Sequence, residues 1–202
     1  MTRRYWIAMW CGVAVAVVGS ICAFLPAIGA EGALAFGRDQ IAVRPATGVG
    51  FLTIGIAIVL TALSPRIGPR SFVLAASFAF LSLGVVASIA LLELARGQGA
   101  VSSGVPSRGT LVAFTMAGSS LWLRIMSVRL CGWLGPPIAA LGLAALAGHA
   151  LDVPLLYWYS PHWTGMAVVT SALCVPMGVG IYLMPRNGFL ARMLGAPNGA
   201  MA

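Results

Sequence analysis

One short stretch of the chain gathers the side chains best suited to binding a ligand. Two tyrosines, two tryptophans and a histidine lie within residues 157–163: Tyr157, Trp158, Tyr159, His162 and Trp163. Such rings can pack against a lipid, a quinone, a pigment or a partner helix. Tyrosine and tryptophan also collect at membrane–water interfaces, because part of each ring system is apolar and part is polar. The stretch therefore predicts either an interfacial aromatic belt or a contact site for a ligand or partner.

A second histidine, His149, precedes Asp152 by about one helical turn. A neutral imidazole can ligate the metal of a haem or of a chlorophyll-type pigment. A histidine near a membrane surface can instead form a hydrogen bond with a neighbouring group. Haem, quinone and chlorophyll-type pigment are thus the cofactors that these residues could take, and the sequence firmly implies none of them.

The sequence supplies no recognisable catalytic set. It has no lysine, no paired carboxylates within an apolar run and no glycine-rich phosphate loop before a helix. Its four cysteines lack the CxxC spacing of zinc and redox sites. We therefore expect a non-enzymatic protein with no catalytic residues and no metal site. The cysteines are Cys11, Cys22, Cys131 and Cys174.

The overall composition is that of a membrane protein. Hydrophobic residues make up 60% of the chain and charged residues 8%, and the mean hydropathy is +0.97. A soluble domain of this size could not bury so much apolar surface. The net charge of +8 comes from arginines at the ends of apolar runs. Charge placement therefore indicates membrane topology rather than binding to nucleic acid.

Six apolar segments predict an all-α, polytopic membrane domain over residues 1–186, followed by a short cytoplasmic tail over residues 187–202. We interpret the first apolar run as an uncleaved span rather than a secretory signal. The second span is expected to end at Ser64-Pro65, because proline interrupts a helix. The six predicted spans cover about 5–28, 47–64, 71–94, 109–127, 133–151 and 164–184.

Six spans put both termini on one side of the membrane. That side carries arginines and no acid, whereas the opposite side carries Arg38, Arg44, Arg96 and Arg108 together with all four acids. The positive-inside rule then predicts cytoplasmic termini in a bacterial inner membrane. The arginines on the predicted cytoplasmic side are Arg3, Arg4, Arg66, Arg70, Arg124, Arg129, Arg186 and Arg192.

A repeat frame recurs near the start of every second span, with Thr at i, Phe or Cys at i+4 and Gly at i+8. The starts, at residues 47, 110 and 170, are separated by 63 and 60 residues. These positions share one helix face, and small residues allow close helix contact in lipid. We therefore expect three parallel hairpins, about 5–64, 71–127 and 133–185, each packed through its own frame. The expected packing residues are Thr47, Gly55, Thr110, Gly118, Thr170 and Gly178.

Several short stretches carry a family resemblance. They are Pro45-Ala46-Thr47 with Phe51 and Gly55, Leu91-Leu92-Glu93-Leu94 before Gly97, Gly148-His149, Val153-Pro154-Leu155-Leu156-Tyr157, Thr164-Gly165-Met166-Ala167, Thr170-Ser171-Ala172-Leu173 and Pro185-Arg186. Together they resemble the multi-span N-terminal membrane region of bacterial sensor histidine kinases and diguanylate cyclases. The chain departs from that pattern at Gly48, where alanine is usual, at Arg108-Gly109, where Pro-Asn is usual, and at His149, where tyrosine is common.

The resemblance implies a sensory membrane module, and the output domain typical of that family is missing from the chain. We therefore expect a non-enzymatic protein that acts through contacts with another integral membrane protein in the lipid bilayer. The alternative is a constitutive accessory subunit of a respiratory or photosynthetic membrane complex, in contact with pigment or quinone.

Overall fold

The computed structural model describes residues 3–30, 43–95, 106–125, 129–157 and 165–184. These residues form six α-helices and three short 3₁₀ helices, and no strand occurs among them. The prediction of an all-α fold is therefore confirmed. The elements are α1 (Arg3–Phe24), η1 (Leu25–Ile28), α2 (Pro45–Ile67), α3 (Pro69–Ala95), α4 (Arg108–Ile125), η3 (Arg129–Leu134), α5 (Gly135–Leu151), η4 (Pro154–Tyr157) and α6 (Val168–Leu183).

Proline and left-handed residues mark where the helices begin and end. Pro45 and Pro69 start α2 and α3, because proline tolerates the first turn, whose amides lack helical partners. Gly68 separates these two helices with φ +92°, a backbone conformation that suits glycine. Asp152 ends α5 with φ +58°, and the amide of Val153 closes that end on the Gly148 carbonyl.

The candidate membrane span in α2 ends at Ser64, as predicted, and the helix itself continues past Pro65 to Ile67. Proline at position 65 has no amide hydrogen to donate to the carbonyl of Thr61. The hydroxyl of Ser64 donates to that same carbonyl at 2.8 Å. The serine thus replaces the hydrogen bond that the proline removes. The helix therefore continues for less than one further turn, to Ile67.

Three helical segments are long and apolar enough to cross a membrane: Arg3–Phe24, Pro45–Ser64 and Cys131–Leu151. Val73–Val85 in α3 and α6 (Val168–Leu183) are apolar but shorter. The chain is therefore an all-helical protein with three candidate membrane spans among its described residues.

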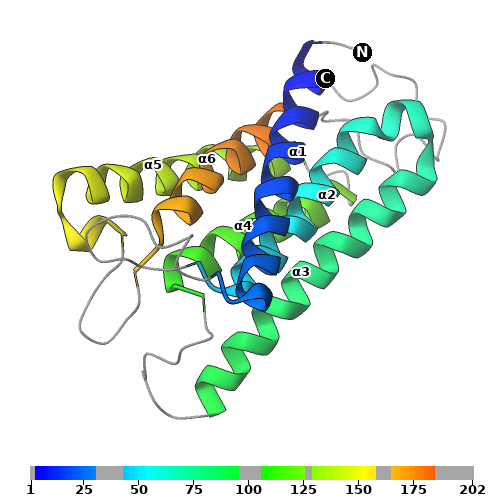
Figure 1. Ribbon diagram of the computed structural model, residues 1–202. Coiled ribbons are helices and arrows are strands. Elements are labelled where there is room, and N and C mark those ends of the chain that lie inside the picture. Colours follow the sequence, from blue (N-terminus) through cyan, green and yellow to red (C-terminus); the bar gives the residue numbers. More distant parts are fainter. Residues whose placement is uncertain (1–2, 31–42, 96–105, 126–128, 158–164, 185–202) are drawn as a thin grey trace.

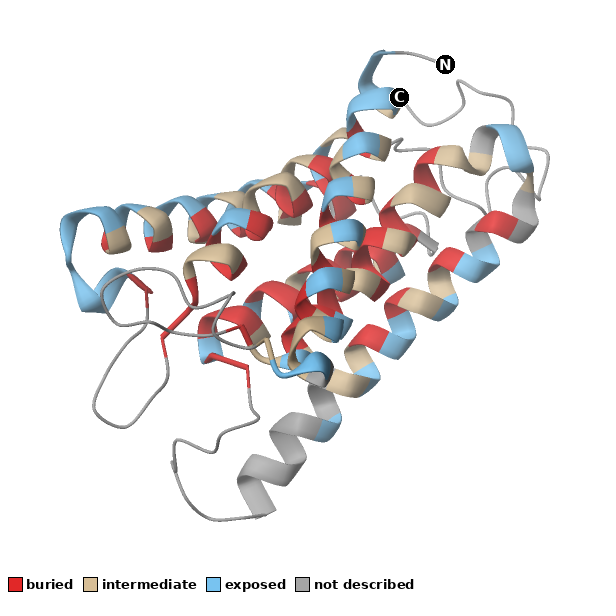
Figure 2. Ribbon diagram, in the orientation of Figure 1, coloured by how far each residue is buried: buried red, intermediate tan, exposed pale blue. Residues whose placement is uncertain are grey.

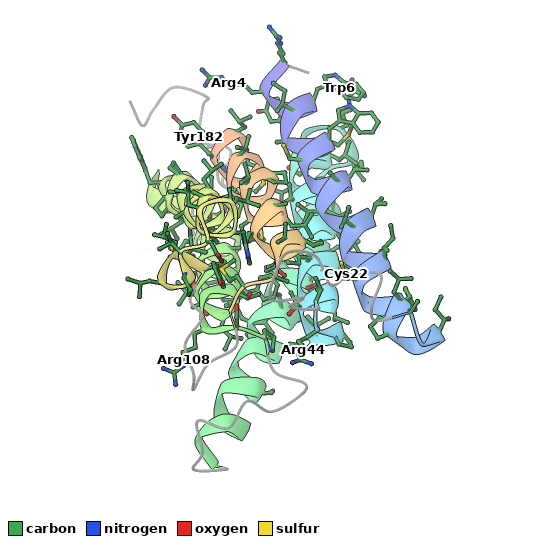
Figure 3. All side chains as sticks on the ribbon, turned by 60° about the vertical axis from the view of Figure 1, so that its left-hand side comes forward. Arg4, Trp6, Cys22, Arg44, Arg108 and Tyr182 are labelled. Atoms are coloured by element: carbon green, nitrogen blue, oxygen red, sulfur yellow. The ribbon has the colours of Figure 1, made fainter. Side chains whose placement is uncertain are left out.

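Successive helices run in opposite directions, so the bundle has two distinct ends (Figure 1). We name the basic end by Arg3, Arg4, Arg66 and Arg124, and the mixed end by Arg44, Arg108 and Asp152. At the basic end, Arg66 of α2 lies over the ring of Trp6 in α1, 5.8 Å from its centroid. Figure 3 shows Arg4, Trp6 and Tyr182 together at the basic end, with Arg44 and Arg108 at the mixed end.

The six helices close into a ring of three hairpins: α1 with α2, α3 with α4, and α5 with α6. Each first helix also contacts the second helix of another hairpin: α3 packs on α2, α5 on α4, and α1 on α6. The second helices α2, α4 and α6 contact one another. They form the inner helices, and α1, α3 and α5 form the outer ones. Figure 2 shows the buried residues turned toward the centre of this arrangement.

Candidate functional site

The repeat-frame glycines lie where each inner helix meets the outer helix of its own hairpin. A β-carbon added at Gly55 would lie 2.5 Å from the amide nitrogen of Ala16 in α1. One added at Gly178 would lie 2.6 Å from the amide nitrogen of Ala139 in α5. Gly118 instead faces a side chain of α3. The three equivalent glycines thus occupy equivalent places in the ring.

The repeat-frame threonines, Thr47, Thr110 and Thr170, are all buried in the first turns of the inner helices at the mixed end. The hydroxyls of Ser107 and Thr110 form a hydrogen bond at 2.7 Å, and the Thr110 amide donates to the Ser107 hydroxyl at 3.3 Å. Ser107 therefore caps the start of α4, a role that its place beside the predicted span could have indicated.

The equivalence of the inner helices extends beyond the three positions of the frame. Besides the frame's own position i+4, the residues at i+7, i+11 and i+14 are buried in all three cases and, with i+4, make up the centre of the core; the last of them in the third case, Met184, directly follows α6. The sets are Phe51, Phe114 and Cys174; Ile54, Ala117 and Met177; Ile58, Leu121 and Ile181; and Thr61, Arg124 and Met184. In the first set the rings of Phe51 and Phe114 meet edge to face, 4.8 Å apart.

The last of these sets places a charged side chain in the core. Arg124 is only 2% exposed, and its Nη2 donates to the carbonyl of Met184 at 2.8 Å. The carbonyls at a helix C-terminus carry partial negative charge, so a cation is favourable beside them. The position of Arg124 in the sequence indicates the charged flank of a span and gives no sign of this buried contact between α4 and the end of α6.

At the mixed end, His149 joins α5 to the segment that precedes α6. Its Nε2 lies 2.7 Å from the carbonyl of Met166, so this nitrogen carries the proton and donates. The imidazole stacks on the ring of Tyr157, with centroids 4.2 Å apart and planes 12° apart. The amide of Met166 donates to the carbonyl of Tyr157 at 2.7 Å. We call these three residues, His149, Tyr157 and Met166, the histidine latch.

The histidine latch changes the interpretation of two predicted contact residues. Tyr157 is 2% exposed, so it packs inside the bundle rather than in an interfacial belt. The Nε2 of His149 already has an acceptor, and Tyr157 covers one face of its ring, so the latch occupies one of the two ring nitrogens that could ligate a haem or pigment metal. Met166 contributes only its backbone, which the sequence gives no means to recognise. The remaining predicted contact residues, Trp158, Tyr159, His162 and Trp163, lie outside the described residues.

Among the described residues, no three histidine, cysteine or acidic side chains gather where they could hold a metal ion. The fold and the two ends define an all-helical protein with apolar helices suited to a membrane. No family model, curated protein or solved structure matches the chain.

Proposed function

We propose that the chain is a six-span, non-enzymatic membrane module that acts through contact with another integral membrane protein, in the manner of a sensory membrane region. In this proposal all six helices cross a bacterial inner membrane, and both termini lie in the cytoplasm. The observation that carries the proposal is the apolar outer surface of the helical ring, together with the unequal charge of its two ends.

The outer surface is apolar on all three hairpins. Large apolar side chains there are more than half exposed, whereas a soluble monomer rarely exposes such side chains over one continuous area. Lipid and a partner helix are the environments that suit them. These side chains are Trp10, Val17 and Phe24 on α1; Val73, Leu74, Phe80 and Leu81 on α3; and Leu143 and Leu151 on α5.

The two ends support the proposed orientation. Asp152 lies at the mixed end, as does Glu93 near the C-terminus of α3, whereas the basic end has Arg3, Arg4 and Arg66 on α1 and α2. Arginine-rich ends of membrane helices stay in the cytoplasm. The mixed end would then face outward, together with the histidine latch.

The connections at the basic end favour a partner within the membrane. Gly68 alone separates α2 from α3, and residues 126–134 join α4 to α5. A stable protein–protein interface buries about 800 Å² on each partner, which such short turns supply poorly. The long outer faces of α1 and α3 offer a larger surface, and we propose that the partner packs there with help from Trp158 and Trp163.

The orientation is tested by single cysteines at described, exposed positions. Leu155 in η4 is 83% exposed at the mixed end, and Ile67 at the end of α2 is 60% exposed at the basic end. A membrane-impermeant thiol reagent should label Leu155→Cys in intact cells, and Ile67→Cys only after permeabilisation. The unmodified chain gives the background from the native cysteines. Labelling in the reverse pattern overturns the orientation.

The partner is tested by affinity isolation from native membranes, with mass spectrometry of all retained proteins. A Trp158→Ala, Trp163→Ala double variant is compared with a chain that lacks residues 187–202. Aromatic anchors at the centre of an interface contribute about 2 kcal/mol or more each, so the double variant should retain far less of a membrane-spanning partner. Loss of partners only in the tail deletion refutes the membrane-embedded model. A stoichiometric complex that survives gentle isolation would favour an accessory subunit over a sensory module.

A further inference from the structure

Two basic side chains hold the last helix at its two ends. His149 of α5 bonds to the carbonyl of Met166, two residues before α6 begins. Arg124 of α4 bonds to the carbonyl of Met184, directly after α6 ends. Both bonds join residues far apart along the chain, and both end on backbone atoms. They therefore fix the position of α6 itself rather than that of one of its side chains.

The two bonds are too far apart to interact directly. With a rise of about 1.5 Å per residue, the 16 residues of α6 separate them by about 24 Å. Any influence of one bond on the other must pass through α6 or through the helices packed on it.

The contacts of α6 with its neighbours suit such transmission. Gly178 and Gly142 bring the backbones of α5 and α6 together, with the carbonyl of Ser171 only 2.6 Å from a β-carbon added at Gly142. A contact made by backbone and small residues has few interlocking side chains to stop one helix from sliding a short way along the other. Pro176 lies inside α6 and removes one of its internal hydrogen bonds, which allows a bend.

We propose that α6 is a coupling helix. Loss of the His149–Met166 hydrogen bond at the mixed end weakens the Arg124–Met184 hydrogen bond at the basic end, and loss of the Arg124–Met184 bond likewise weakens the His149–Met166 bond. Because equilibrium coupling between two sites is reciprocal, each change must be visible from the other end. The coupling is a property of this chain alone, so it can be true or false whether or not the proposed membrane partner exists.

Amide hydrogen exchange on the purified full chain in lipid nanodiscs tests the coupling. His149→Phe keeps an aromatic ring against Tyr157 and removes the donor to Met166. The exchange rate in the last turn of α6, residues 180–184, should then rise about fivefold, the effect expected when one hydrogen bond is lost. Arg124→Met, which keeps the length of the side chain, should in turn raise exchange at the Met166 amide and in the first turn of α6.

Ser107→Ala is the matched control, because it removes a hydroxyl hydrogen bond at the same end of the bundle but at the start of α4. It should raise exchange at the start of α4 and leave residues 180–184 unchanged. If His149→Phe affects only residues near Met166, the two ends are independent and the proposal is wrong. It is equally wrong if His149→Phe raises exchange in the last turns of α2 and α4 as much as in α6, because the bundle has then loosened as a whole. The His149→Phe experiment needs no change at Arg124, so it decides the matter even if Arg124→Met does not fold.

Discussion

The first and third hairpins are packed differently from the second. In the first, Gly55 faces the backbone of Ala16, and in the third, Gly178 faces the backbone of Ala139. In the second, the equivalent Gly118 faces the side chain of Leu83. A backbone cannot withdraw from an added atom, whereas a leucine can change rotamer. Equivalent glycines in a repeat therefore need not contribute equally to stability, and the substitutions below measure the difference.

Gly55→Leu and Gly178→Leu should have the largest effects. A new side chain at either position would be driven into the backbone of the neighbouring helix, so the two helices must separate. Overpacking of this kind costs about 3 kcal/mol, which lowers the unfolding temperature of a chain of this size by about 6–12 °C. Thermal unfolding in detergent checks this, and wild-type stability of both variants would remove the basis of the comparison.

Arg124→Ala should have the next largest effect, because the Arg124 side chain joins the second hairpin to the end of α6 in the third. The change removes a buried hydrogen bond to Met184 and leaves a cavity, at a cost of about 2–3 kcal/mol. Arg124→Met fills the same volume without a charge, so its free energy of unfolding should fall clearly less than that of Arg124→Ala. Thermal unfolding of both variants and the wild type in the same detergent measures the difference in stability between them. An unchanged Arg124→Ala protein would show that the second hairpin does not rely on this contact.

Gly118→Leu should cost about 1 kcal/mol, the lower end of the range for overpacking. The obstruction is the side chain of Leu83, 2.6 Å at Cγ from an added β-carbon. Combining Gly118→Leu with Leu83→Ala exchanges the large and small residues, so the double variant should recover most of the loss. A double-mutant cycle from unfolding data measures this recovery, and strictly additive losses would show that Leu83 is not the obstacle.

Gly84→Ala should have the smallest effect, with the opposite sign. Gly84 lies within α3, and a β-carbon there would meet no atom within 4 Å. Alanine in a helix interior is favoured over glycine by about 0.5–1 kcal/mol. The variant should therefore unfold at a slightly higher temperature than the wild type. A loss of stability in the isolated protein would mean that this face of α3 is already covered.

The sequence predicts the helical class and the grouping of equivalent helices because both follow from local patterns. Apolar runs between arginines mark the helices, and the spacing of Thr47, Phe51 and Gly55 recurs in the other two inner helices. The span in α2 ends at Ser64 as predicted, but the continuation of the helix to Ile67 was not predicted. It depends on Ser64, whose hydroxyl supplies the hydrogen bond that Pro65 removes, and such compensation depends on the rotamer of one side chain.

The candidate site was only partly predictable. His149 and Tyr157 were identified as contact residues, but their contact with each other depends on how residues 152–157 turn at the end of α5. In the sequence, Arg124 fits the pattern of an arginine that flanks a membrane span. That pattern gives no reason to expect the side chain to be buried. Its partner is a backbone carbonyl of Met184, an atom that every residue has. A long-range contact to a backbone atom does not require a particular residue type at that position, so it can be identified only from the fold.

The contact between α1 and α6 has a consequence for the order in which the hairpins are connected. This contact closes the ring. The first and last helices therefore lie side by side, just as helices that are consecutive in the sequence do. Helix α1 begins at the basic end and α6 ends there. The turn at Gly68 lies at the same end, with φ +92° and no atom within 4 Å of an added β-carbon. A circularly permuted chain that starts at Pro69 and ends at Ile67, with the original termini joined, would keep every helix in place. We therefore expect the same core to form whichever hairpin comes first in the chain.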